Sequence, residues 1–139
     1  MRHSGKSLTL AALGISAWVA SELIYRLGII PRLPEMRHVP IVWWLAYLLP
    51  ILAAIVAAGI VSRTAREALT NGLWLAVPPI VLVTVYGTFT GLPIGHDMWI
   101  DTPDYWLRGI IQVSITVLAV VITAAVSRNV AIRMERSKT

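Results

Sequence analysis

The feature that most constrains this chain is the stretch of residues 69–90, which reads LTNGLWLAVPPIVLVTVYGTFT. About twenty apolar residues in a helix cross a hydrocarbon core of roughly 30 Å. Pro78 and Pro79 lie near the middle of the stretch and each removes a helical N–H donor. The stretch therefore predicts a membrane-spanning helix that is kinked close to the bilayer midplane.

Three further stretches are long and apolar enough to span, namely residues 8–25, 41–61 and 105–127. The composition agrees, because 57% of the 139 residues are hydrophobic and the mean hydropathy is +0.73. Pro50 predicts a second kink near the centre of the span at 41–61. We therefore expect a single all-α domain, an integral membrane four-helix bundle with a kinked third helix.

The positive charge of the chain predicts its orientation. The N-terminus, the middle turn and the C-terminal tail hold two, two and four of the twelve lysines and arginines, against four on the opposite side. Cytoplasmic segments carry this excess, so both termini are predicted to be cytoplasmic. The net charge of +5 is then explained by contact with the lipid bilayer, and no basic run with interleaved aromatic residues predicts nucleic-acid binding.

Cofactor and metal motifs are missing from the sequence. The chain has no cysteine, and nucleotide-binding and EF-hand patterns are absent, so we expect no cofactor. His38, His96, Asp97 and Asp101 form no recognised metal spacing, and we expect a solvated loop there without a metal. That outer region also allows charge pairing between two loops, through Arg26, Arg32 and Arg37 on one side and Asp97, Asp101 and Asp104 on the other.

Glu22 is the only acidic residue inside a predicted span. Ionisable groups in a membrane are costly, and they are functional candidates for that reason. The alternative is structural, because Arg26 follows four residues later and can pair with Glu22 on one helix face.

Four spans each place one polar residue at a similar depth below the outer surface. Tyr47, Thr84 and Gln112 lie about 9 to 10 Å from the outer ends of their spans, at about 1.5 Å per residue, and Glu22 and Tyr86 lie near the same level. We expect these five side chains to meet and to form the floor of a small cavity that opens outward. A structural polar plug is the alternative.

Small residues predict close helix packing or a homodimer seam. They form four candidate faces: Ala12, Ser16 and Ala20; Ala53 and Ala57; Ala54 and Ala58; and Gly87 and Gly91.

The favoured function is a non-enzymatic accessory or assembly subunit that binds a membrane-protein partner or forms a homo-oligomer. The alternative is a small transporter or channel that uses the cavity around Glu22. Four short spans with one glutamate in the first resemble the small multidrug resistance transporters in architecture alone. A third hypothesis is a lipid-active enzyme that uses His96 and the outer-loop arginines.

Overall fold

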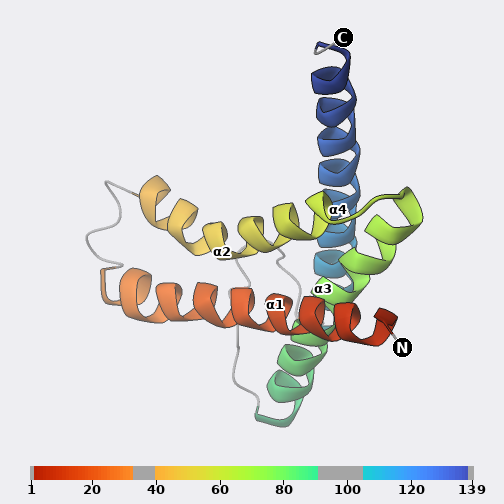
Figure 1. The fold of residues 1–139 in the computed structure, drawn as a ribbon. Coiled ribbons are helices and arrows are strands. Elements are labelled where there is room, and N and C mark those ends of the chain that lie inside the picture. The colour runs from red at the N-terminus through yellow and green to blue at the C-terminus, as the bar shows by residue number, and fades with distance from the viewer. Residues whose placement is uncertain (1, 33–39, 91–104, 138–139) are drawn as a thin grey trace.

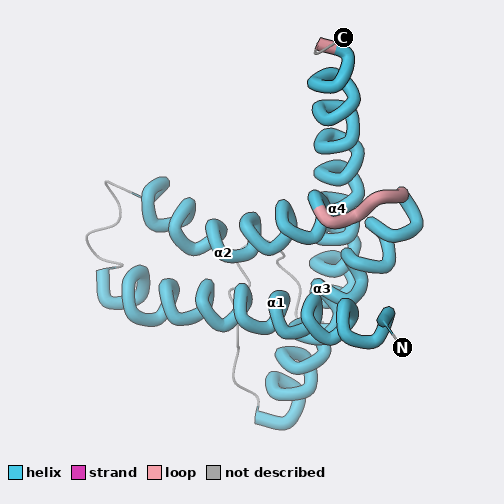
Figure 2. Tube along the Cα trace, viewed as in Figure 1, coloured by secondary structure: helices cyan, strands magenta, loops and turns pink. Residues whose placement is uncertain are grey.

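The computed structural model of the chain (Figure 1) describes residues 2–32, 40–90 and 105–137. Nearly all of these residues are helical, and no strand occurs among them (Figure 2). The four long helices are α1 (Arg2–Ile24), α2 (Pro40–Ile60), α3 (Ala65–Thr90) and α4 (Tyr105–Arg136). A π-helical turn, Tyr25–Ile29, and a 3-10 turn, Ile30–Arg32, extend α1. The predicted all-α fold with four helices is confirmed.

Three helical segments are long and apolar enough to cross a membrane, judged by length and composition. They are Gly5–Ile29, Ala65–Tyr86 and Gly109–Arg136, and a shorter apolar segment covers Leu45–Ile60 of α2. The helices extend beyond the predicted spans, most clearly in α4, which ends nine residues later than expected. Residues 128–136 contain no glycine or proline that would end a helix.

The helices form two antiparallel pairs that cross each other. Figure 1 shows α1 and α2 side by side, running across the direction of α4. The helix α3 contacts each of the other three, whereas α1 and α4 do not touch within the described residues. Up-and-down bundles instead keep all four helices nearly parallel. Contacts between the crossed pairs are therefore concentrated where the helices intersect.

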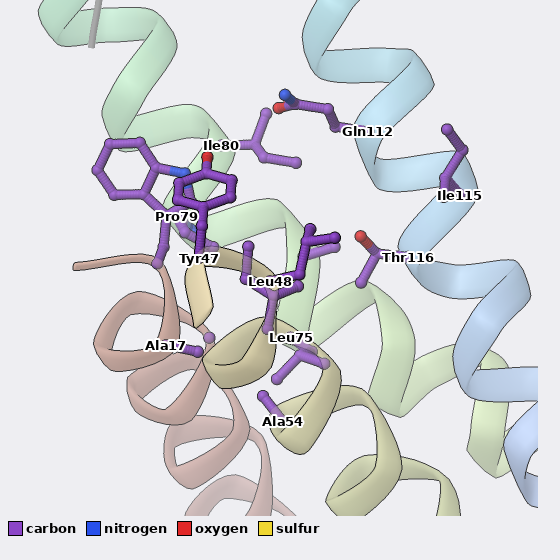
Figure 3. A pocket seen from close by; sticks show the side chains of 14 residues that line it. Ala17, Tyr47, Leu48, Ala54, Leu75, Pro79, Ile80, Gln112, Ile115 and Thr116 are labelled. Carbon is purple, nitrogen blue, oxygen red and sulfur yellow. The ribbon is translucent and has the colours of Figure 1, made fainter. Parts of the chain in front are cut away.

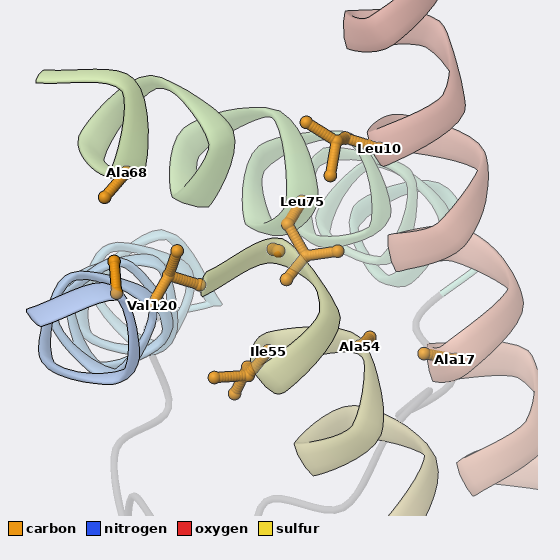
Figure 4. Packing of buried hydrophobic residues seen from close by; sticks show 9 residues of the cluster. Leu10, Ala17, Ala54, Ile55, Ala68, Leu75 and Val120 are labelled. Carbon is orange, nitrogen blue, oxygen red and sulfur yellow. The ribbon is translucent and has the colours of Figure 1, made fainter. Parts of the chain in front are cut away.

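The core at this intersection is built mainly from small side chains. Its buried cluster contains Leu10, Ala17, Ala54, Ile55, Ala58, Ala68, Leu75, Val120 and Ala124 (Figure 4). Five of these nine residues are alanine, which allows the close helix approach on which packing in lipid depends. Figure 4 shows Ala17 of α1 and Ala54 of α2 facing each other.

Three of the four predicted small-residue faces can be compared directly with this core. The pair Ala54 and Ala58 is buried, whereas Ala53 and Ala57 are exposed. On α1, Ala12 and Ser16 are exposed and Ala20 is half-buried, so this face does not form the packed side within the chain, and of its two predicted roles only the homodimer seam remains. The packed side runs instead through Leu10, Gly14, Ala17 and Ser21. The pair Gly87 and Gly91 falls outside the residues whose side chains the structure describes.

Pro78 and Pro79 lie inside one continuous α-helix, so the backbone of α3 is not unwound there. Pro79 lacks the N–H that would bond to the carbonyl of Leu75. That oxygen lies against Gly14 of α1, so closely that a Cβ on this glycine would overlap it. Gly14 therefore packs directly against the freed carbonyl. Pro50 likewise lies inside the continuous helix α2.

A second close approach joins α2 to α4. A Cβ built on Gly59 would lie 2.7 Å from the Cβ of Thr123, which is tighter than side-chain contacts allow. The hydroxyl of Thr123 turns back to its own helix and donates to the carbonyl of Ala119 at 2.8 Å. Each crossing therefore places a glycine of one helix against its neighbour, as expected for helices held together in lipid.

Candidate functional site

Glu22 lies at the end of α1 and pairs within its own helix. Its Oε1 accepts a hydrogen bond from Nε of Arg26 at 2.8 Å. The Glu22 side chain is 12% exposed and that of Arg26 is 54% exposed, so the arginine reaches outward while the carboxylate stays sheltered. Helical structure continues beyond Glu22 through the π-helical turn that ends at Ile29 and the 3-10 turn that ends at Arg32, so Glu22 is not the last residue of the helical segment. The geometry matches the structural alternative for Glu22.

Beyond this pair, the end of α1 packs against α2. Ile29 and Tyr47 are buried together beside the end of α1. The rings of Tyr25 and Tyr47 meet edge to face, with centroids 6.1 Å apart, which joins α1 to α2. The second oxygen of Glu22 and the hydroxyl of Ser21 are buried without a hydrogen-bond partner in the described part of the chain.

A cavity of about 360 Å³ lies where the four helices cross (Figure 3). Its wall takes residues from all four helices, among them Trp18, Tyr47, Leu75, Pro79, Gln112 and Thr116. Most of the lining is apolar. Figure 3 shows the Tyr47 hydroxyl and the Gln112 amide toward one end of the cavity, with Ala54 and Leu75 toward the other. The cavity is therefore polar at one end and apolar at the opposite end.

The five predicted site residues do not form one layer. Tyr47 and Gln112 line the same cavity, whereas Glu22, Thr84 and Tyr86 are not part of its lining. The expectation of a shared floor assumed parallel helices, but the crossed pairs keep α1 away from α4.

Thr84 and Tyr86 lie elsewhere on α3. Thr84 is 4% exposed and faces α4, because a Cβ built on Gly109 would lie 3.5 Å from its hydroxyl oxygen. Tyr86 is 45% exposed. Of the three kink prolines, Pro79 lines the cavity and Pro50 and Pro78 do not. The two predicted kinks therefore do not share a wall of the cavity.

The hypotheses on the outer loops concern residues that the structure does not describe. His38, Arg37, His96, Asp97, Asp101 and Asp104 all fall outside the described ranges. Among the residues that are described, no three or more histidine, cysteine, aspartate or glutamate side chains lie close enough together to hold a metal ion.

A polar cluster at the opposite end of the molecule was missed from the sequence. Glu67 forms an ion pair with Lys6, and its Oε2 accepts a hydrogen bond from the backbone N–H of Arg63 at 2.8 Å. The Thr64 hydroxyl accepts from the N–H of Glu67 at 3.1 Å, which caps the start of α3. The sequence T-A-R-E at 64–67 is a capping-box pattern and could have predicted this helix start.

A second polar contact lies beside this cluster. The buried amide of Asn71 donates to the Ser62 hydroxyl at 2.8 Å, and Ser62 donates to the carbonyl of Ala58 at 2.7 Å. These bonds tie the end of α2 to the first turns of α3. Together with the ion pair from Lys6, they bring the start of α1 and the turn between α2 and α3 to the same end of the molecule.

No known protein family, curated protein or solved structure matches this chain. Its function must therefore be inferred from the arrangement of its own residues.

Proposed function

We propose that this protein is a multi-pass membrane protein with both termini in the cytoplasm, and that it acts as a non-enzymatic accessory or assembly subunit. The topology is supported by the contacts at one end of the molecule. Lys6 meets Glu67 there, and Gly59 packs on Thr123 of α4. The basic N-terminus, the middle turn and the C-terminal part of α4 thereby gather on one side, as the charge count expects.

The shorter apolar segment of α2 also fits a spanning helix. The 21 residues of α2 extend about 31 Å at 1.5 Å per residue, which is the thickness of the hydrocarbon core. A helix lying in the interface would present a polar face to water. The exposed side of α2 is instead apolar and includes Leu45, Leu49, Leu52 and Val56.

The observation that carries the subunit proposal is an exposed apolar ridge on α4. It consists of Leu118, Ile122, Val126, Val130 and Met134, which recur every four residues. Rows of side chains spaced four apart are the ridges that pack into the grooves of another helix. All five are at least 43% exposed, so none of the other three helices covers the ridge.

Lipid can cover only the first part of this ridge. The residues from Asn129 to Arg136 are all exposed, and Figure 1 shows this end of α4 standing clear of the other helices. The arginines at 128, 133 and 136 place this segment outside the hydrocarbon. Val130 and Met134 would then be exposed to water, and a short helix is marginal there without packing. A partner helix that continues along the ridge would cover both residues.

Site-specific photocrosslinking in intact membranes tests the proposal. A crosslinking residue at Met134 should give one discrete protein adduct, identified by mass spectrometry as a different membrane protein. The matched control is Ala131, an exposed residue of the same turn that lies off the ridge. A lack of protein adducts at 134 would contradict the proposal, and an adduct of twice the chain's own mass would identify a homodimer instead.

The transporter alternative has less support. A cavity is present, but the residues that line it include no ionisable carboxylate or basic side chain. Glu22, on which the transport hypothesis depends, is paired with Arg26 outside that lining.

A further inference from the structure

The cavity lies at the middle of the helices that surround it. Ala17 is twelve residues from each end of the segment Gly5–Ile29, and Ile51 is eleven residues beyond the start of α2. Leu75 and Ala76 occupy the centre of the segment Ala65–Tyr86. With the membrane placement proposed above, on which this inference rests, the surroundings of the cavity at that depth are acyl chains rather than water.

The size and lining of the cavity decide what can fill it. Protein interiors leave few voids larger than a water molecule. At about 360 Å³ this space is more than twice the roughly 150 Å³ of an engineered apolar cavity that stays dry and binds benzene. Small residues keep the wall open, since Gly14, Ala17, Ala54 and Ala76 all line it. Such a lining favours hydrocarbon over water.

The cavity is also accessible from the bilayer. Ile115 of α4 lines it and is 60% exposed, and Gln112, one turn earlier, is exposed as well. The opening therefore lies beside these two exposed residues of α4. An occupant can enter sideways from the surrounding lipid without crossing a headgroup layer.

We propose that the cavity binds one acyl chain of a phospholipid from the outer leaflet. Tyr47 and Gln112 each follow the start of their helix by seven residues, so the polar end of the cavity faces the outer surface in the proposed topology. The Gln112 amide can donate a hydrogen bond toward the ester region of the lipid. The chain then extends inward between Leu48 and Ile80 to the apolar end at Ala54 and Leu75.

Native mass spectrometry of the purified full-length chain tests this inference, with lipids stripped until only tightly held molecules remain. The wild type should show an added mass equal to that of one phospholipid molecule. Ala54→Leu places three further carbon atoms in the cavity and should reduce the lipid-bound fraction at least about tenfold, because the space for the chain is lost. The matched control Ala57→Leu alters an exposed alanine three residues later on the same helix and should retain the lipid.

A second pair of substitutions, on α1, provides an independent test in case the first variant misfolds. Ala17→Leu should also lose the lipid, whereas Ala12→Leu, at an exposed position, should keep it. Helical content and elution volume confirm that each variant is folded. The inference is overturned if the wild type retains no phospholipid, if it retains a free fatty acid or a quinone instead, or if a folded cavity variant binds as well as its control. Cysteine accessibility tests the membrane placement separately, so a failure there is distinguishable from a failure of lipid binding.

Discussion

Replacing Gly14 with alanine should destabilise the packing of α1 on α3. The added Cβ would overlap the carbonyl oxygen of Leu75, which Pro79 has already deprived of its helical donor. Because the atom in the way belongs to the backbone, α1 must move as a unit. Overpacking of this kind costs about 1–3 kcal/mol. We expect a loss of this size in the free energy of unfolding.

Gly5 provides a matched control on the same helix. Among the described residues, no atom beyond the neighbouring backbone of its own helix lies within 4 Å of a Cβ built there. Gly5→Ala should therefore be neutral or should stabilise the helix by up to about 1 kcal/mol, since alanine has the higher helix propensity. The free energy of unfolding can be measured in mixed micelles by titration with a denaturing detergent, followed by circular dichroism. The reasoning is refuted if Gly14→Ala is as stable as Gly5→Ala.

Two further substitutions test the polar contacts. Thr64→Ala removes the hydroxyl that caps α3 and should cost about 0.5–2 kcal/mol, measured by the same titration, whereas a cost near zero would show that the cap is not formed. Glu22→Gln removes the charge pair with Arg26 and should change stability by less than about 1 kcal/mol, since one partner is largely exposed. A loss of folding with Glu22→Gln would contradict the structural role of this pair.

The helices and their membrane character could be predicted from the sequence because the hydrophobic runs are long. The packed faces could not. In a soluble helix the polar side marks the exposed face. In lipid both sides of a helix are apolar, so the sequence does not show which side packs against the other helices. The pattern Ala12, Ser16 and Ala20 was therefore as plausible as the packed side through Gly14 and Ala17.

The structure brings only two of the five candidate site residues onto one cavity, for a different reason. Depth along each span was estimated correctly enough to place Tyr47 and Gln112 on one cavity. The estimate contains no information on how the helices cross, and this crossing separates Glu22 from α4. Gly14 was not recognised because its importance depends on Pro79 of another helix. The helix cap at Thr64 and Glu67, by contrast, could have been predicted from the local sequence alone.

The most direct test of the membrane placement is the accessibility of single cysteines. The chain has no cysteine of its own, so single substitutions at Ser4, Thr64, Gly95 and Ser137 can be labelled without background. A membrane-impermeant thiol reagent added outside intact cells should modify only position 95, and all four positions should react once the membrane is opened. Labelling of position 64 from outside would contradict the proposed topology, in which the ion pair between Lys6 and Glu67 lies at the cytoplasmic face.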